Sequence, residues 1–267
     1  MKQSFLLIFF TMTLLFGCKD SKNNSDKTIE KQTDNVESST DWIVLFDGTS
    51  LDGWRAYNGN SLPPGWSIKD KAMVFSSDMI QESDYDYKGS KDIIYAAEEF
   101  ENFEFYVEWK IPPGGNSGIF YHAKEGYPGL PVVAPEYQII DDKNYTKFHD
   151  IKEYNESIGI TKNPQELQLI QSTGADYGMY EPIKSKVLNP AGEWNSTKIL
   201  FTLKKVEYFL NDKKLLEFVP WSEDWNSKKQ SGKWNLAPDY GIYKKGFIGF
   251  QDHGSSLSFR NIKIKKL

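Results

Sequence analysis

The sequence predicts an all-β fold over residues 41–267, a sandwich of two antiparallel sheets. Short runs of β-branched and aromatic residues recur along this part of the chain, and turn-forming residues separate them. No long stretch shows the period of a helix, and aromatic residues make up 15% of the chain, which suits thick packing between two sheets. We therefore expect one large β domain in which helices are accessories.

The predicted strands follow one another at short intervals. In chain order they are Trp42–Phe46, Ala72–Phe75, Asp92–Tyr95, Asn102–Lys110, Ser117–Tyr121, Glu136–Ile140, Leu167–Ile170, Thr197–Leu203, Val206–Leu210, Gly246–Gln251 and Leu257–Ile264. A further strand is expected over Lys214–Phe218, after a turn at Asn211 and Asp212. The sequence predicts one short accessory helix, which begins after Ser222 as N-cap and runs toward Lys229.

Alternation of apolar and polar residues predicts which strand faces are buried. Within Asn102–Lys110 the core face should hold Phe103, Phe105, Val107 and Trp109, and the opposite face Glu104, Tyr106 and Glu108. A second alternating pair of strands turns at Lys204 and Lys205, which predicts a hairpin. The last strand changes parity after Phe259, which a bulge near Arg260 and Asn261 would explain.

The first forty residues predict export and attachment to a membrane. Lys2 precedes an apolar run over Phe5–Phe16, and Gly17 stands directly before Cys18, the only cysteine. This pattern is typical of a lipoprotein signal peptide over residues 1–17, with Cys18 lipidated after cleavage; a conventional signal peptide that contains a cysteine is the alternative. The apolar run is shorter than the roughly twenty residues that a membrane span needs.

Residues 18–40 are expected to form a flexible tether, because they contain too few apolar residues to fold. The residues after Cys18 are not strongly acidic, so we expect a periplasm-facing outer-membrane lipoprotein of the cell envelope. Contact with the membrane should occur through the lipid anchor only. The net charge of −5, with both signs well mixed, gives no basic stripe, so no nucleic-acid partner is expected.

Several motifs occur in one order along the chain. They are Leu45–Trp54, Gly114–Phe120, Pro135–Asp142, Pro190–Asn195, Gln251–Gly254 and Phe259–Ile262. Together they resemble the 3-keto-disaccharide hydrolase family, formerly domain of unknown function 1080. The resemblance implies a concanavalin A-like jelly-roll sandwich with a carbohydrate site on its concave sheet. His122 departs from the pattern, since relatives often carry arginine after the Asn-Ser-Gly strand.

Three residues are the candidates for proton transfer. Glu136 and Gln138 stand two apart on one strand face and can therefore meet one ligand, although a solvated outer face is the alternative. With the resemblance, Glu136 becomes the candidate general base or acid. His253 can shuttle protons near neutral pH or act as a structural histidine. Glu108 is either an exposed strand residue or a second carboxylate that faces Glu136 across the concave sheet.

Substrate contacts are predicted for Asn116, Gln138, Tyr106, Lys110 and Asp141. No spacing resembles an EF-hand, a zinc helix or a cysteine cluster, so no metal site and no cofactor is predicted. A divalent cation held by such donors as Asp141, Asp142, Asp252, Glu108 and His253 is the alternative.

The resemblance implies a substrate, an oligosaccharide or glycoside, that carries a ketone at ring carbon 3. The ketone acidifies the hydrogen on carbon 2, so a base can remove it and the anomeric oxygen can leave before water adds. We expect Glu136 or His253 to abstract this proton and the other to assist the leaving group. The alternatives are a non-catalytic carbohydrate-binding module and a conventional glycosidase acting through Glu108 and Glu136. The Glu-x-Asp-x-x-Glu signature of retaining glucanases on this fold does not occur, which disfavours conventional endoglucanase action.

Overall fold

The computed structural model describes residues 41–76, 79–80 and 91–267. The predicted signal peptide, the lipidated Cys18 and the tether lie outside the described residues. Within the part of the chain that is described, no helix is long and apolar enough to cross a membrane.

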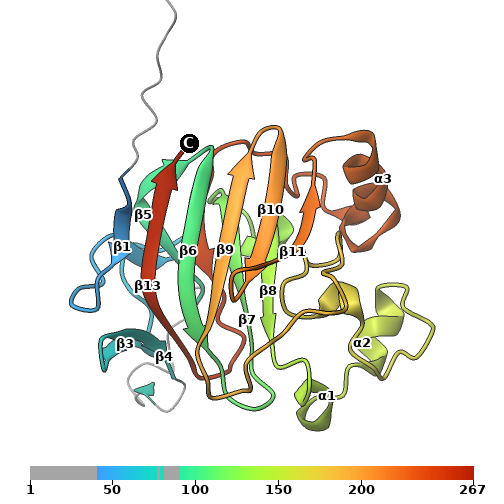
Figure 1. The fold of residues 1–267 in the computed structure, drawn as a ribbon, viewed down its shortest axis with the longest axis horizontal. Helices are drawn as coiled ribbons and strands as arrows, with labels where there is room; N and C mark the ends of the chain where they lie inside the picture. The colour runs from blue at the N-terminus through green and yellow to red at the C-terminus, as the bar shows by residue number, and fades with distance from the viewer. Residues whose placement is uncertain (1–40, 77–78, 81–90) are drawn as a thin grey trace, which may run out of the picture. The chain divides into compact units, whose positions relative to one another are not determined.

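Two antiparallel sheets face each other (Figure 1). The eight-stranded sheet has the order β11 (Lys213–Phe218), β10 (Lys205–Leu210), β9 (Asn195–Thr202), β6 (Phe103–Lys110), β13 (Leu257–Lys266), β4 (Ala72–Phe75) and β3 (Trp66–Lys69), and β1 (Ile43–Phe46) also pairs with β13. The five-stranded sheet has the order β2 (Trp54–Ala56), β5 (Ile93–Phe100), β12 (Gly246–Phe250), β7 (Asn116–Ala123) and β8 (Glu136–Ile140). The predicted jelly-roll sandwich is confirmed.

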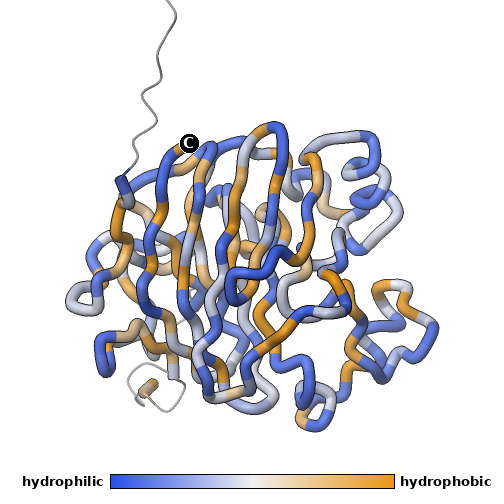
Figure 2. Tube along the Cα trace, in the orientation of Figure 1, coloured by the Kyte–Doolittle hydropathy of each residue, from blue (hydrophilic) through white to orange (hydrophobic). Residues whose placement is uncertain are grey.

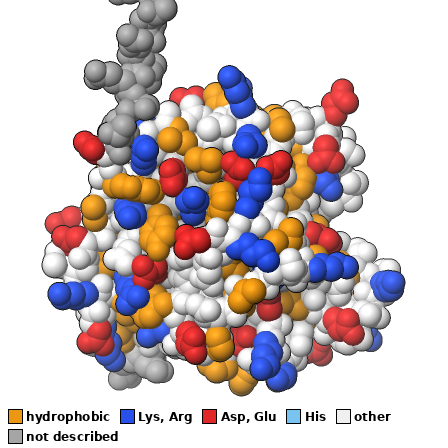
Figure 3. Space-filling view, in the orientation of Figure 1, with side chains coloured by type: hydrophobic (Ala, Val, Ile, Leu, Met, Phe, Trp, Pro, Cys, Tyr) orange, Lys and Arg blue, Asp and Glu red, His pale blue; other side chains and the backbone are white. Residues whose placement is uncertain are grey.

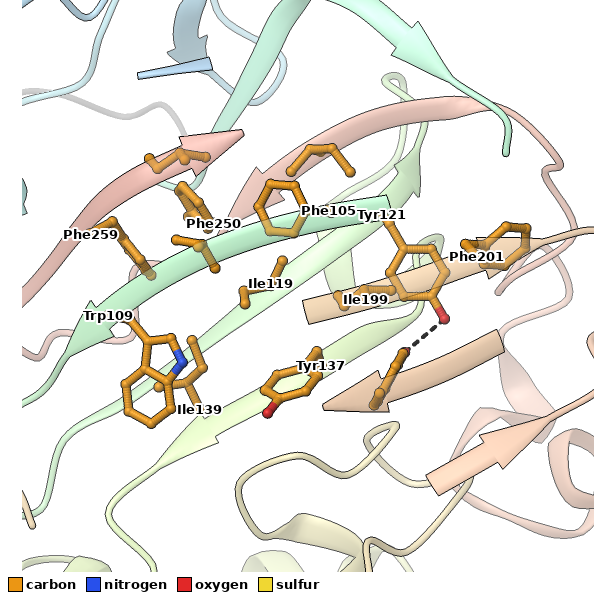
Figure 4. Packing of buried hydrophobic residues seen from close by; sticks show 14 of the residues in the cluster. Phe105, Trp109, Ile119, Tyr121, Tyr137, Ile139, Ile199, Phe201, Phe250 and Phe259 are labelled. Atoms are coloured by element: carbon orange, nitrogen blue, oxygen red, sulfur yellow. Dashed lines mark hydrogen bonds between the residues drawn. The ribbon is translucent and has the colours of Figure 1, made fainter. Parts of the chain in front are cut away.

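The core lies between the two sheets, as the alternation predicts. The expected inward residues of β6 are all 1% exposed or less: Phe103, Phe105, Val107 and Trp109. They pack against the inner face of β7 and β8, and Figure 4 shows Ile119, Tyr137 and Ile139 from these strands beside Trp109 and Phe105. The indole N–H of Trp109 donates to Thr197 Oγ1 at 2.9 Å, which satisfies the one polar group of the ring. Figure 2 shows the alternation along the strands.

The turns and caps follow local sequence signals in most places. The register of β13 against β6 shifts between Arg260 and Lys263, so the predicted bulge is confirmed. Helix α3 (Glu223–Ser231) begins after Ser222, whose Oγ accepts the N–H of Trp225 at 3.2 Å, and this prediction is also confirmed.

The predicted strand Leu167–Ile170 is wrong. Its residues enter a 3₁₀ turn, η4 (Leu169–Gln171). A reciprocal capping box between Gln168 and Gln171 favours the 3₁₀ turn over a strand. Its side chains pair with backbone N–H groups that would otherwise bond to a neighbouring strand. Strands β2 and β3 and the short helices α1 (Tyr145–Phe148) and α2 (Lys152–Ser157) were not predicted.

The five-stranded sheet is covered on its outer side as well. All residues of β7 and β8 are buried, although only alternate ones face the core. Residues 130–134, which include η3 (Leu130–Val132), pack over Phe120 of β7. The long connection from β8 to β9 packs over the end of β8, where Tyr145, Ile151 and Leu167 surround Ile140. This second cover buries polar residues that a bare sheet would leave in water.

Candidate active site

A cavity of about 420 Å³ lies over the outer face of β7 and β8. The sheet contributes Asn116, Glu136, Gln138 and Ile140 to its lining. The connection after β8 contributes Tyr145, His149, Asp150, Ile151, Tyr154, Leu167, Gln171 and Tyr177. Pro131, Lys233, Gln251 and His253 complete the wall. A mixed polar and aromatic lining of this size suits a small ligand.

Antiparallel pairing brings the polar residues of the two strands onto one face. Asn116 lies opposite Ile140, and Gly118 lies opposite Gln138. Directly opposed residues point to the same side of a sheet, so Asn116, Glu136 and Gln138 converge on the cavity. The absence of a side chain at Gly118 makes room for Glu136: a Cβ there would lie 2.2 Å from Glu136 Oε1.

Glu136 is a buried acid without a partner in the described part of the chain. Its side chain makes no hydrogen bond or ion pair there, and the residue is 4% exposed. Burial raises the pKa of Glu136 to about 8, the positive charge of Lys233 opposes this rise, and the negative charge of Asp92 adds to it. A carboxyl with such a pKa can take up and release protons near neutral pH.

The amides beside Glu136 have free hydrogen-bonding capacity. The Nδ2 of Asn116 lies 3.4 Å from the hydroxyl of Tyr145, while its buried Oδ1 has no partner among the described residues. The Oε1 of Gln138 accepts the N–H of Ile139 at 3.0 Å. A buried amide oxygen without a partner is costly, so a hydroxyl-bearing ligand that donates to Asn116 would remove this cost.

The cavity wall formed by the β8–β9 connection is held by its own polar network. Gln171 Nε2 donates to Asn155 Oδ1 at 2.7 Å, and Asn155 Nδ2 donates to the carbonyl of Pro164 at 2.7 Å. Lys186 pairs with Asp142 at 2.7 Å and is the more buried partner of the two. These buried contacts fix a wall that has little regular secondary structure.

His253 stands at the rim of the cavity on a braced turn. The carbonyl of Gln251 accepts the hydroxyl of Ser117 at 2.9 Å, which ties the turn to β7. Asp252 Oδ1 accepts the N–H of Gly254 at 2.7 Å, and Gly254 has a φ of +77°, so the expected tight turn is confirmed. The imidazole of His253 is exposed and faces the same cavity as Glu136.

Lys233 lies in the turn η5 (Lys233–Leu236) and contributes a positive charge to the wall. Its Nζ stands 4.1 Å from the ring centre of Tyr177, 4.4 Å from that of Trp234 and 5.5 Å from that of Tyr154. Aromatic faces attract cations, so the rings hold the ammonium group in place. The hydroxyls of Tyr154 and Tyr177 are 2.8 Å apart, which joins two of these rings.

Three predicted site residues lie on the other sheet. Of the two interpretations of Glu108, the exposed strand residue agrees with the structure, and the carboxylate that faces Glu136 is wrong. Tyr106, Glu108 and Lys110 belong to β6 of the eight-stranded sheet, whereas Glu136 belongs to β8 of the five-stranded sheet. The buried residues of β6 lie between, so Glu108 points away from the cavity. The alternation predicted for β6 is confirmed, but β6 lies in a different sheet from Glu136.

The outer face of β6 is a solvated face with its charges paired. Glu108 accepts hydrogen bonds from Arg260 at 2.6 Å and Asn261 at 2.7 Å, and Tyr106 donates to it at 3.3 Å. Burial alone would raise the pKa of Glu108, but these donors outweigh it and the pKa is lowered. Lys110 lies over the ring of Trp194 at 5.0 Å. Figure 3 shows acidic and basic side chains intermixed on this side of the molecule.

Asp141 does not line the cavity, so the expectation of a substrate contact is not supported by its position. It is 4% exposed, and its Oδ2 accepts the N–H of Gly114 and the Nδ2 of Asn144, both at 2.9 Å. Asp141 therefore positions the turn before β7 and the start of α1. His122 occupies the position at which the resemblance led us to expect arginine. It is 2% exposed, and its ring centre lies 4.3 Å from that of Phe201.

Sequence reasoning missed Lys233, His149 and the tyrosines of the wall. They lie in segments without strand alternation, and no spacing links Tyr177 to Lys233. His149 was assigned no role, yet it lines the cavity, stacks 4.5 Å from Tyr145 and lies 3.0 Å from the carbonyl of Gly114. The one usable signal was the high aromatic content, which does not say which rings face a ligand.

Metal binding has no evident site in the described residues. Over residues 41–76, 79–80 and 91–267, no group of three or more His, Cys, Asp or Glu side chains is placed to hold an ion. The donors named above for a divalent cation are dispersed, since Glu108 lies on the other sheet and Asp141 is occupied by amide donors.

The chain is similar to one family and to one protein whose names refer to 3-keto sugars. Residues 41–265 match the family model described as a 3-keto-alpha-glucoside-1,2-lyase-like domain. A protein of Bacteroides thetaiotaomicron named 3-keto-disaccharide hydrolase is 36% identical over 246 residues, which cover 85% of this chain and 78% of that protein.

Two crystal structures from Parabacteroides distasonis, both of provisionally assigned glycosyl hydrolases, share the fold. One is 39% identical with a TM-score of 0.72 and covers 85% of this chain and 94% of its own. The other is 26% identical with a TM-score of 0.57 and covers 85% of this chain and 100% of its own.

Proposed function

The chain belongs to the 3-keto-alpha-glucoside-1,2-lyase-like family, and from this premise we propose that it cleaves glycosides or disaccharides that carry a ketone at ring carbon 3. The observation that carries the proposal is Glu136, an acid buried at the cavity floor without a partner among the described residues and with its pKa raised to about 8. Such a group suits removal of a weakly acidic carbon-bound proton.

Because the ketone acidifies the hydrogen on carbon 2, a single base is enough to start the cleavage. Glu136, in its ionised form, removes the proton from carbon 2, and the electron pair of that bond forms an enolate on carbons 2 and 3. When the ketone re-forms, the bond from carbon 1 to the glycosidic oxygen breaks and leaves a double bond between carbons 1 and 2. Water then adds to this double bond, so the net reaction is hydrolysis.

His253 assists the leaving group in this scheme, because its imidazole lines the same cavity as Glu136 and an imidazolium can donate a proton. Protonated His253 gives its proton to the departing oxygen, which would otherwise leave as an alkoxide. Asn116 and Gln138 orient the sugar hydroxyls, since both amides face the cavity from the sheet. The two strands thus supply the base and the polar contacts, and the turn after β12 supplies the acid.

One assay separates this proposal from the alternatives. The purified protein is incubated with a disaccharide and, separately, with its 3-keto derivative, and released monosaccharide is measured. Cleavage of the keto form alone supports the proposal. Cleavage of both forms would instead indicate a conventional glycosidase, for which Asp150 is the second carboxylate on the cavity lining. Saturable binding without any product would indicate a carbohydrate-binding module.

We also propose, from the sequence of residues 1–40, that Cys18 carries a lipid and anchors the chain in the cell envelope. In cells fed a radiolabelled fatty acid, the wild-type protein should incorporate label and the Cys18→Ser protein should not. Labelling of both proteins would contradict attachment at this cysteine.

A further inference from the structure

Lys233 carries a positive charge on the cavity wall, and no acidic side chain of the described residues pairs with it. Lys233 is the one Lys or Arg on the cavity lining, and its Nζ forms no hydrogen bond or ion pair with a described residue. By contrast, Lys186 pairs with Asp142 at 2.7 Å, and Lys214 pairs with Glu207 at 3.1 Å. A cation held in a cavity without a paired carboxylate attracts negative charge from a ligand.

The aromatic rings fix where this charge stands. Three rings, Tyr154, Tyr177 and Trp234, lie within 5.5 Å of the Nζ of Lys233. Trp234 is itself anchored, because its indole N–H donates to the carbonyl of Tyr177 at 2.8 Å. The ring faces carry no negative formal charge, so they orient the ammonium group without neutralising it, and it can still donate a hydrogen bond to a ligand oxygen.

The position of Lys233 relative to Glu136 fits a reaction in which charge moves across the cavity. Glu136 loses its negative charge when it takes the proton from carbon 2, and the same charge then appears on the oxygen at carbon 3. Lys233 and Glu136 line one cavity and interact electrostatically. A fixed cation close to the developing oxyanion stabilises the transition state more than the neutral ketone.

We propose that Lys233 is a catalytic residue whose ammonium group stabilises the negative charge on the carbon 3 oxygen of the substrate after carbon 2 loses its proton. This inference rests on the proposed function and adds an electrophilic partner for the base. The lysine keeps its proton throughout: it donates a hydrogen bond to the enolate oxygen, and the charge returns to the departing glycosidic oxygen when the ketone re-forms.

The experiment compares Lys233→Met, Lys233→Arg and Lys228→Met with the wild type on a 3-keto-glucoside. Lys228 is the matched control, because it also lies over a ring, that of Tyr180 at 5.1 Å, but does not line the cavity. Lys233→Met should lower kcat by about 100-fold or more with a small change in KM, since the lost contact acts mainly in the transition state. Lys233→Arg should recover part of the loss, and Lys228→Met should leave kcat unchanged.

A substrate deuterated at carbon 2 gives a readout that loss of structure would not imitate. Without Lys233 the proton-removal step becomes slower relative to the others, so the rate ratio between the protiated and deuterated substrates should rise above that of the wild type. Thermal unfolding of each variant shows whether it is folded.

The outcomes distinguish this inference from the proposed function. Cleavage by the wild type with an unchanged kcat in folded Lys233→Met would overturn the role of Lys233 and leave the proposed function standing. A rise in KM alone would also overturn it and would indicate a binding contact, as for a substrate carboxylate. No cleavage of the keto substrate by the wild type would overturn both.

Discussion

The outer faces of the two sheets carry similar residues and differ in what surrounds them. β6 presents Tyr106 and Glu108 outward, and β8 presents Glu136 and Gln138 outward, with the same alternation. Glu108 has three hydrogen-bond donors and a lowered pKa, whereas Glu136 has none among the described residues and a raised pKa. Hydrogen-bond donors stabilise the carboxylate form of Glu108. Burial without such donors destabilises the carboxylate form of Glu136, which makes it a stronger base.

The cover over the second face creates this difference. Residues 141–171 fold over the end of β8 and enclose a cavity, whereas the outward residues of β6 stay half-exposed. Enclosure removes water from Glu136, which raises its pKa and strengthens its interaction with Lys233. The reactive face is therefore produced by a loop rather than by the strand that carries the acid.

The largest effect is expected from Glu136→Gln, which removes the base and keeps the shape. Cleavage of a 3-keto-glucoside should fall about 1,000-fold or more, within the range for loss of a general base. The matched control is Glu108→Gln on the other face, for which kcat/KM should stay within about twofold of the wild type. A comparable loss in both variants would mean that the two faces do not differ as described.

A second effect concerns the dependence of stability on pH. The pKa of Glu136 is about 8 in the folded protein, against an ordinary glutamate value of 4.5, so between these pH values the folded state holds a proton that the unfolded state has lost. Stability from this group is therefore present below pH 4.5 and falls as the pH rises to about 8. The gap corresponds to at most roughly 5 kcal/mol.

Glu136→Gln abolishes this titration. Denaturant unfolding at pH 5 and pH 8.5 should show the variant gaining up to about 4 kcal/mol over the wild type between the two pH values. The same change at Glu108, whose pKa is lowered, should not give such a gain. An unfolding free-energy difference between Glu136→Gln and the wild type that is independent of pH would contradict the raised pKa.

A smaller effect is expected from Gly118→Ala, which displaces the acid without removing it. The added Cβ would lie 2.2 Å from Glu136 Oε1, so the side chain must move, and kcat should fall about 100-fold. Gly129→Ala is the control, because its nearest atom would be Pro131 Cδ at 3.6 Å and its φ is not positive. Full activity in Gly118→Ala would show that the carboxyl need not occupy this position.

The smallest effect is expected from His253→Ala at the exposed rim. Loss of the acid that protonates the leaving group should lower kcat about 10-fold to 100-fold for a sugar leaving group. The loss should shrink for a nitrophenyl leaving group, which departs without a proton. An equal loss for both leaving groups would rule out this role and point to a contact that only positions the substrate.

The sequence predicts most of the strands but not the sheet that each strand joins. Alternation identified the core face of β6, because burial on one side leaves a period of two. In β8, which is buried on both sides, alternation placed Glu136 and Gln138 together on one face. It could not show that Glu108 and Glu136 lie on different sheets, since pairing between distant strands leaves no local signal. Lys233 could not be predicted from the sequence, because it lies in an irregular turn whose neighbours are set by tertiary packing.

Proton removal by Glu136 can be measured apart from cleavage. A 3-keto sugar that lacks the anomeric oxygen has no glycosidic leaving group, so in deuterated buffer removal of the proton on carbon 2 is seen as exchange for deuterium, which proton NMR follows at that carbon. We predict that the wild type and Glu108→Gln accelerate this exchange over buffer and that Glu136→Gln does not. Exchange by Glu136→Gln at the wild-type rate would contradict the assignment of Glu136 as the base.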